Sequence, residues 1–441
     1  MSAGRWRASL LLALIVSGYL FISALYAANT PAWQVPDEPA HYNYVAQVAA
    51  HGCCPVIAEG DWDNAYLEAI KAARFSPEAL SGRLDTVQYE DHQPPLYYLL
   101  AAPIFHLSDG NLTALRLFSA LLGAGAVIAA WAAARIAFPA QPWLAVGAAG
   151  IVAFLPQRVA MMAGVNNDAL AELLAGLILV VCVWHIRGSG AWTIPAMGAL
   201  LGLAFITKLT VYPMAGVIAV AILLRARDDR APLRMSLARL VGAFALATLI
   251  GLPFWARNVQ TYGWPDFLAQ AAHDDVVVGQ PQTAGYIAAQ GTGAWLGDAA
   301  RITFQSFWGQ FGWMGVPMTG TIYLALAGFS VVVTVGALAG FAGARRSMRA
   351  DQHHALIVLA VSALLTFGAF AYYNLRFVQF QGRYLFPALI PIALCAAFGL
   401  AWWAGRTGRR VFVPISMIAL VVGMAAFALY VLYRIILPAL A

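Results

Sequence analysis

Long uncharged apolar runs recur along the whole sequence and limit the folds that this chain can adopt. Each run has about 17 to 25 residues, the length that an α-helix needs to cross the hydrocarbon core of a bilayer. Only 10% of the 441 residues are charged and 61% are hydrophobic, too few charges for the surface of a soluble domain. Transmembrane β-strands would instead give short alternating segments. The sequence therefore predicts an all-α polytopic membrane protein.

We expect a bundle of about eleven transmembrane helices. The predicted spans are residues 8–28, 112–134, 143–157, 169–186, 191–207, 210–224, 236–255, 321–343, 354–374, 383–404 and 411–433. Arg5 and Arg7 precede the first run, which lacks a small-x-small cleavage pattern and is interpreted as a retained anchor. The expected regions are a first transmembrane helix at 1–28, a first outer loop at 29–111, a transmembrane bundle at 112–255, a second outer loop at 256–320 and C-terminal transmembrane helices at 321–441.

The distribution of basic residues predicts the orientation in the membrane. The loops on the side of the N-terminus carry fifteen arginines against only three acidic residues. These arginines are residues 5, 7, 135, 187, 225, 227, 230, 234, 239, 345, 346, 349, 406, 409 and 410. Because Lys and Arg favour cytoplasmic loops, we expect the N-terminus inside and the C-terminus outside. The net charge of +6 thus reflects membrane orientation, and no nucleic-acid partner is expected.

Residue usage also bears on compartment and cofactors. The Arg- and Ala-rich composition is compatible with a GC-rich bacterial genome, which favours the bacterial inner (plasma) membrane with a periplasmic outer face. Cys53 and Cys54 are adjacent in the first outer loop, where either a vicinal disulfide or two free thiols fit the sequence. No CxxC or HxxxH spacing supports a metal site, so no cofactor is expected, although a divalent metal is left open.

The first outer loop is rich in carboxylates, Pro and Trp and is expected to fold on the membrane surface. Residues 40–50 and 65–73 are typical of short interfacial helices. The apolar run at 94–105 is too short to span the membrane. Long ordered loops on a helical bundle usually carry function.

The first candidate motif is Pro36-Asp37-Glu38-Pro39, a few residues beyond the first span. In one interpretation Glu38 caps a helix that starts at Pro39, and Asp37 supports the helix dipole. In the other, a carboxylate at the membrane surface accepts a proton from an attacking hydroxyl group, which is general-base catalysis. The two interpretations are compatible, because a fixed helix start also fixes the carboxylate.

A second motif combines Glu90, Asp91, His92 and Gln93 with a rigid Pro94-Pro95 pair. The prolines could simply start a helix while the polar residues face water. Alternatively, these four side chains lie beside Asp37 and bind a headgroup.

Further polar and charged residues are predicted at the outer ends of helices, where charges are costly and usually face a cavity or a partner. They are Arg158, Asn166, Asn167, Asp168, Lys208, Arg257, Asn258, Arg376 and Arg383. Lys208 interrupts an apolar stretch where two spans turn outside, and it pairs with Asp168 either as a structural bridge or to orient a phosphate. Arginine suits phosphate because its planar fork donates paired, charge-assisted hydrogen bonds. Arg116 and Arg434 are interpreted as snorkelling residues at the membrane boundary.

Taken in order, these motifs resemble a known superfamily. An Asp-Glu pair after the first span is followed by Pro-Pro-Leu-Tyr-Tyr, Asn-Asp-Ala-Leu, Phe-Ile-Thr-Lys, Pro-Phe-Trp-Ala-Arg-Asn and Gly-Arg-Tyr-Leu-Phe-Pro. The set is similar to that of the GT-C glycosyltransferases, in particular the lipid A aminoarabinose transferases, the protein O-mannosyltransferases and related bacterial membrane proteins. The resemblance covers about residues 8–400.

The resemblance implies a GT-C-like bundle and a transferase that takes a sugar from a polyprenyl-phosphate donor. It implies a catalytic role for Asp37, shared in part by its neighbour Glu38. Donor phosphate contacts are implied for Asp168, Lys208, Arg257, Arg383 and Tyr384. The aminoarabinose transferases usually have Lys before Pro-Pro-Leu, where this chain has Gln93, so one expected phosphate contact is missing. Further substrate-binding candidates are Glu90, Asp91, His92, Gln93, Arg158 and Arg376.

We therefore predict a membrane glycosyltransferase of the cell envelope that acts by single displacement with inversion. Asp37 would remove the proton of the acceptor, which is a lipid, a glycan or a protein, and basic residues would hold the leaving phosphate. Two other classes fit the same residues less well: a lipid or solute transporter or flippase, and a non-catalytic envelope assembly subunit. A transporter would place its charges near mid-bilayer, whereas here they gather at the outer ends of the helices.

Overall fold

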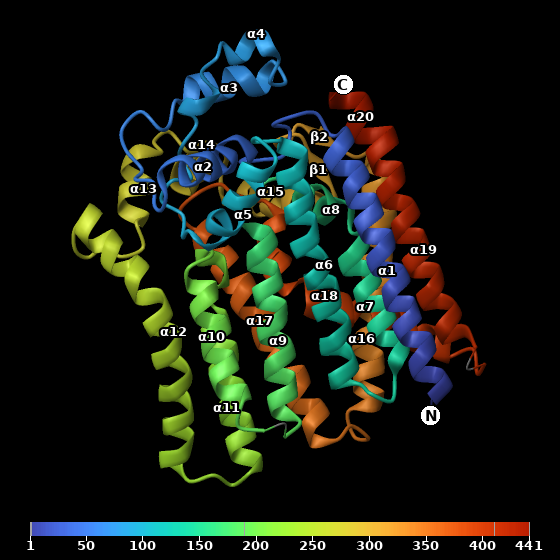
Figure 1. Cartoon of the computed structure of the whole chain (residues 1–441). Helices are drawn as coiled ribbons and strands as arrows, with labels where there is room; N and C mark the ends of the chain where they lie inside the picture. Colours follow the sequence, from blue (N-terminus) through green and yellow to red (C-terminus); the bar gives the residue numbers. More distant parts are fainter. Residues whose placement is uncertain (1, 189, 410, 441) are drawn as a thin grey trace.

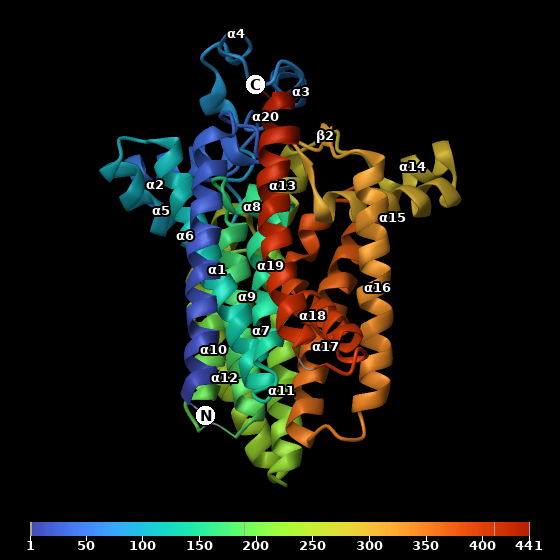
Figure 2. The ribbon, with the colours of Figure 1, turned by 90° about the vertical axis from the view of Figure 1, so that its right-hand side faces the viewer.

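The computed structural model describes residues 2–188, 190–409 and 411–440, with side chains from residue 9 onward. Arg410 and the side chains of Arg5 and Arg7, which the charge count includes, lie outside this description. The chain forms a bundle of long helices with a layer of shorter helices at one end (Figures 1 and 2). The N-terminus lies at the opposite end from this layer, and the C-terminus lies beside it.

Nine helical segments are long and apolar enough to cross a membrane, within the part of the chain that the structure describes. Six of them are single helices: α1 (Ser2–Asn29), α6 (Leu112–Ala137), α9 (Asp168–Ile186), α12 (Leu233–Tyr262), α16 (Gly320–Ala344) and α17 (Ala350–Asn374). Two begin with a 3-10 segment: η2 (Leu209–Val211) precedes α11 (Met214–Asp228), and η3 (Gly382–Ala388) precedes α18 (Leu389–Gly405). The ninth is α19 (Phe412–Val431), which η4 (Leu432–Ile436) and α20 (Leu437–Leu440) continue. The prediction of an integral, all-helical membrane protein is confirmed.

Two predicted spans take a different form. Helices α7 (Pro142–Phe154) and α8 (Pro156–Met162) meet at a bend of 60°, because Leu155 precedes a proline and adopts an extended conformation. Helix α10 (Thr193–Phe205) has 13 residues, a length of about 20 Å, which is too short for a hydrocarbon core of about 30 Å. The predicted span at 191–207 is therefore not a full-length helix, although the segment still runs from the end of α9 to Lys208 beside the start of α9. The helix ends early because the polar pair Thr207–Lys208 leaves the helical path, with Lys208 extended.

The shorter elements lie at the end of the bundle where α1 ends (Figure 1). They are α2 (Glu38–His51), α3 (Asn64–Ala72), α4 (Pro77–Leu80), η1 (Leu84–Thr86), α5 (Leu96–Leu107), α13 (Gln270–Val276), α14 (Thr283–Gln290), α15 (Thr292–Trp308) and the strands β1 (Gln310–Phe311) and β2 (Val316–Pro317). The strands pair antiparallel, Gln310 with Pro317 and Phe311 with Val316. Helices α2 and α3 confirm the short helices predicted at 40–50 and 65–73, and α5 is the short apolar helix expected at 94–105.

We call residues 30–95 and 263–319 the outer cap. The cap has a small hydrophobic core of its own, separate from the core of the bundle. The first outer loop contributes Leu67, Ile70 and Phe75 to it, and the second contributes Val277. The Trp62 indole also donates to the carbonyl of Val278, at 2.8 Å. The two outer loops are therefore folded against each other.

Small residues allow the helices of the bundle to approach closely. A Cβ atom on Gly399 of α18 would lie 1.8 Å from the Val333 carbonyl oxygen of α16, and one on Gly336 would lie 2.5 Å from the Gly399 carbonyl oxygen. Close backbone contact of this kind is a main source of helix association in lipid, where apolar side chains gain little by leaving the solvent.

Candidate functional site

Asp37 lies at the start of α2, where the cap meets the bundle. Its backbone is in the left-handed region with φ 66°, which Asp tolerates better than most residues, and its side chain makes no capping hydrogen bond to α2. The carboxylate instead accepts a hydrogen bond from the Tyr89 hydroxyl at 2.9 Å and pairs with the Arg383 guanidinium at 2.5 Å. Residues from three distant parts of the sequence thus meet at one carboxylate.

The ion pair with Arg383 controls the charge of Asp37. Burial raises the pKa of the carboxyl group, but the Arg383 guanidinium outweighs this effect and lowers the pKa of Asp37 to about 2. Arg383 is buried, with 6% of its side chain exposed, and it uses only Nη2 on Asp37. Its Nε and Nη1 atoms are buried without a hydrogen-bond partner among the described residues. Unsatisfied donors on a buried guanidinium are the groups that acceptor atoms of a ligand would bind.

A second ion pair lies in the same cluster. Lys208 Nζ is 2.6 Å from Asp168 Oδ1, joining the end of α10 to the first residue of α9. Asp168, Arg383 and Tyr384 line one small pocket. Burial and the positive charges of Lys208 and Arg383 lower the pKa of His41 to about 3, although the carboxylates of Asp37 and Asp168 act to raise it. His41 is therefore neutral, and its Nδ1 lies 2.8 Å from the Tyr98 hydroxyl.

Two further carboxyl groups flank this cluster. Burial and the negative charge of Asp37 raise the pKa of Glu90 to about 7, and one of its oxygens has no hydrogen-bond partner among the described residues. Burial also raises the pKa of Asp91 to about 8, although Gln47 donates to it at 2.7 Å. Glu90 thus stands beside Asp37, as the sequence predicts for this motif.

The neighbouring polar residues of the motif face other partners. The His92 ring lies 4.3 Å from that of His273, so the two outer loops meet here, and burial lowers the pKa of His92 well below its usual value. Gln93 accepts a hydrogen bond from Asn167 at 3.3 Å, next to Asp168. Gln93 therefore borders the cluster, whereas His92 lies at the contact between the loops.

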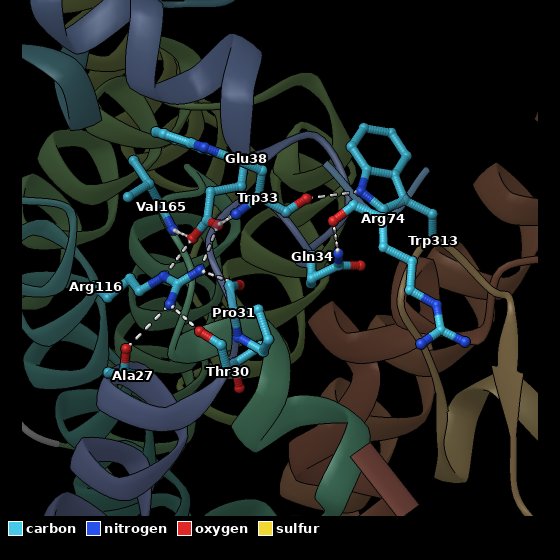
Figure 3. Close-up of polar contacts among 10 residues, drawn as sticks. All are labelled: Ala27, Thr30, Pro31, Trp33, Gln34, Glu38, Arg74, Arg116, Val165 and Trp313. Carbon is cyan, nitrogen blue, oxygen red and sulfur yellow. Dashed lines mark hydrogen bonds and ion pairs between the residues drawn. The ribbon is translucent and has the colours of Figure 1, made fainter. Parts of the chain in front are cut away.

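Glu38 has different partners from Asp37 and points toward Arg116 and Val165 (Figure 3). Its two oxygens accept from Arg116 Nε and Nη2 at 2.7 and 2.6 Å and from the backbone amides of Trp33 and Val165 at 3.0 and 3.2 Å. Four hydrogen bonds use the acceptor capacity of a carboxylate, so the geometry leaves Glu38 no part in proton transfer. Capping is also excluded, since Glu38 is itself the first residue of α2.

Arg116 uses all of its N–H groups in the same hydrogen-bond network. Its remaining N–H groups donate to the carbonyls of Ala27, Thr30 and Pro31 at 2.7 to 3.1 Å. Both charged side chains are buried, at 3% and 0% exposure. The interpretation of Arg116 as a snorkelling boundary residue is therefore wrong, because its guanidinium turns inward to the end of α1 and the start of α2.

The structure does not bring three other predicted residues into the cluster. Arg158 has no exposed surface and pairs with Glu172 at 2.6 Å inside the bundle, so it cannot contact a substrate. Arg257 donates to the carbonyls of Cys54 and Pro55, next to the disulfide that joins Cys53 and Cys54. Arg376 is 67% exposed at the outer rim and pairs with Asp274 at 2.7 Å.

Sequence reasoning also missed residues that the structure places in the cluster. Tyr89 donates to Asp37 and His41 lies within the field of the same charges, yet neither is among the residues predicted for the site. Tyr89 directly precedes Glu90, so its position next to an acidic tetrad was the available signal. No group of three or more His, Cys, Asp or Glu side chains suited to a metal ion occurs among the described residues.

Comparisons with known proteins agree on the class of fold. Residues 92–255 match the family described as dolichyl-phosphate-mannose-protein mannosyltransferase. The crystal structure of ArnT from Cupriavidus metallidurans bound to undecaprenyl phosphate is similar, with a TM-score of 0.54, 15% identity and coverage of 100% of this chain and 74% of that chain. The apo state of the same protein gives a TM-score of 0.55, 14% identity and the same coverage.

An oligosaccharyltransferase from Archaeoglobus fulgidus, in complex with Zn and sulfate, is also similar, with a TM-score of 0.54, 14% identity and coverage of 93% of this chain and 52% of that chain. Comparison with curated protein sequences finds no match. The chain has the GT-C fold, and the matches together support a membrane glycosyltransferase of the GT-C superfamily.

The Glu38–Arg116 pair gives a stability prediction. Replacing Arg116 with Ala leaves a buried carboxylate without a counter-charge, so we expect a loss of about 3 to 5 kcal/mol. Thermal unfolding of the purified protein in detergent measures it. Arg83→Ala, which breaks the exposed pair with Asp63, is the matched control and should cost no more than about 1 kcal/mol. Equal losses in the two variants would show that Glu38 is not held as described.

Glu90 and Asp91 give a pH prediction. Their folded pKa values of about 7 and about 8 lie above those of unfolded carboxyl groups, so the neutral forms stabilise the folded state. That stability is fully present below about pH 4 and is lost as the pH rises to about 7 or 8. We expect the melting temperature of the wild type to fall over this window. In Glu90→Gln/Asp91→Asn the fall should be shallower, and an unchanged profile in the double variant would contradict the raised pKa values.

Proposed function

We propose that this protein transfers a sugar from a polyprenyl-phosphate-linked donor to an acceptor hydroxyl group at the extracytoplasmic face of the membrane. The observation that carries the proposal is the arrangement of Asp37, Arg383, Lys208 and Asp168 at the end of the bundle. Arg383 offers unsatisfied donors beside a carboxylate, which suits a phosphate and a reacting hydroxyl group in one site. Support for the donor class comes from the fold shared with ArnT, whose structure was solved with undecaprenyl phosphate.

The proposed reaction is a single displacement with inversion. The acceptor oxygen attacks the anomeric carbon, the bond from that carbon to the phosphate oxygen breaks, and the polyprenyl phosphate leaves. Asp37 accepts the proton of the acceptor hydroxyl group. Arg383 and Lys208 stabilise the charge on the leaving phosphate, and Tyr384 and Asp168 line the same pocket.

The Asp37–Arg383 pair suggests how the donor prepares the base. While it is paired with Asp37, the guanidinium keeps the pKa of Asp37 at about 2, which makes the carboxylate a weak base. A donor phosphate competes with Asp37 for Arg383, because both are anions that accept from the same fork. When Arg383 turns to the phosphate, the pKa of Asp37 rises and the carboxylate becomes a better proton acceptor. Base strength is thus linked to the presence of the donor.

The same proposal places the protein in the bacterial plasma membrane. The arginine-rich loops would lie in the cytoplasm by the positive-inside rule. The outer cap and the ion-pair cluster would then face the periplasm, and the outer cap would recognise the lipid, glycan or protein acceptor.

Substitution of Asp37 tests the proposal. Radiolabelled sugars are supplied on a panel of polyprenyl phosphates to membranes that carry the wild type, Asp37→Asn or Asp85→Asn, and label in new products is counted. We expect transfer from one donor by the wild type and a loss of about 100-fold or more in Asp37→Asn, since a general base contributes at least this factor. Asp85, an exposed acid of the same loop, is the matched control and should be dispensable.

A folding check by thermal unfolding separates loss of catalysis from loss of structure. Transfer to a hydroxyl acceptor by folded Asp37→Asn at the wild-type rate would refute the role of Asp37. Failure of the wild type to transfer any sugar, with lipid binding preserved, would instead favour a flippase or a docking subunit.

A further inference from the structure

A second cavity lies at the opposite end of the bundle, where the arginine-rich loops are found. It has a volume of about 520 Å³ and is formed by the ends of α9, α10, α11 and α12. Its charged and polar lining consists of His185, Arg225, Asp229 and Arg239, and its apolar lining includes Ile194 and Met235. None of these residues belongs to the cluster around Asp37.

Of the two arginines of this cavity, Arg225 is paired and Arg239 is not fully paired. Arg225 holds Asp229 at 2.6 Å and also donates to the Ile186 carbonyl at 3.3 Å. Arg239 is 3.7 Å from the same carboxylate, beyond hydrogen-bond distance, and its nearest acceptor is the Met235 sulfur at 3.5 Å. Arg239 Nη1 is buried without a hydrogen-bond partner among the described residues. A buried donor without a partner costs free energy, so an additional acceptor at this guanidinium would be stabilising.

His185 provides a second unsatisfied atom in the cavity wall. The residue is 6% exposed, and its Nε2 has no hydrogen-bond partner within the described part of the chain. The Thr193 hydroxyl donates to the Gly190 carbonyl at 3.0 Å, so His185 Nδ1, 2.7 Å from that hydroxyl, must be the donor of their hydrogen bond. In the neutral ring Nε2 then carries a lone pair, which accepts a hydrogen bond from a hydroxyl group.

The charges indicate the kind of ligand. Two arginines and one aspartate leave a single positive charge, which matches a phosphodiester with one negative charge. Basic pockets between transmembrane helices at the cytoplasmic side commonly bind lipid headgroups. The apolar residues of the lining suit the glycerol and first acyl carbons of such a lipid, and a free anion would leave them uncovered.

We infer that this cavity, which we call the inner cavity, binds the headgroup of an anionic phospholipid whose phosphodiester is followed by a hydroxyl-bearing group. The phosphodiester accepts from the unsatisfied Nη1 of Arg239, beside the Arg225–Asp229 pair, and a headgroup hydroxyl donates to His185 Nε2. Phosphatidylglycerol has this chemistry. Phosphatidylcholine has the phosphodiester but carries a cation and no headgroup hydroxyl.

Native mass spectrometry of the full chain in detergent, titrated with phosphatidylglycerol or phosphatidylcholine, tests the inference. We expect one tightly bound phosphatidylglycerol and binding weaker by about tenfold or more for Arg239→Gln, since a charge-assisted hydrogen bond is lost. The matched control is Arg234→Gln, which removes an exposed arginine of the same helix outside the cavity and should bind like the wild type. Phosphatidylcholine should not form a defined complex.

Four outcomes would overturn the inference, and the last concerns a cavity-filling variant. Arg239→Gln could bind like the wild type, or Arg234→Gln could lose as much affinity, which would indicate general surface attraction. Alternatively, sodium phosphate could displace phosphatidylglycerol and raise the melting temperature in an Arg239-dependent way, which would assign the cavity to a free anion. Ala238→Phe fills the cavity without changing its charge and keeps the test valid if Arg239→Gln fails to fold. The inference requires that this variant also lose the bound lipid.

Discussion

The buried ion pair between Glu38 and Arg116 fixes the junction on which the outer half of the molecule is built. Arg116 lies on α6, and its five N–H groups bind the carboxylate of α2 and the carbonyls where α1 ends. The carboxylate in turn binds the amide of Val165, three residues before α9. Four segments are thereby held at one point. Neither charge can lose its partner without leaving the other buried and uncompensated.

This junction explains how two adjacent acids come to serve different purposes. Both carboxylate oxygens of Glu38 already accept hydrogen bonds, so no acceptor position is free. Asp37, in contrast, is turned by its left-handed backbone toward Tyr89 and Arg383. Because Glu38 is fixed, the direction of Asp37 is fixed with it. The chemistry of each carboxylate is thus set by its surroundings, and the Asp-Glu sequence alone does not distinguish them.

Features that depend on one short segment could be predicted from the sequence, and features that depend on packing could not. Hydropathy located the long helices and the interfacial helices, and the position of Lys208 in an apolar stretch correctly suggested its contact with Asp168. The early end of α10 was missed because an apolar composition continues past the point where its hydrogen bonding stops. The partners of Arg116 and Arg257 lie 78 and about 200 residues away along the chain, so no spacing rule could pair them. The roles assigned to Asp37, Lys208 and Arg383 remain predictions.

The outer cap and the bundle are parts of one chain that are surrounded by different solvents, and the cap has a hydrophobic core of its own. The bundle packs in lipid, where close contact of small residues such as Gly399 and Gly336 replaces the hydrophobic effect. The cap buries Phe75 and Val277 out of water, so its cohesion weakens with urea and on cooling. Lipid composition therefore governs the scaffold, while the aqueous phase governs the segment that lies over Asp37. The cohesion of these two hydrophobic cores therefore responds to different variables within one chain.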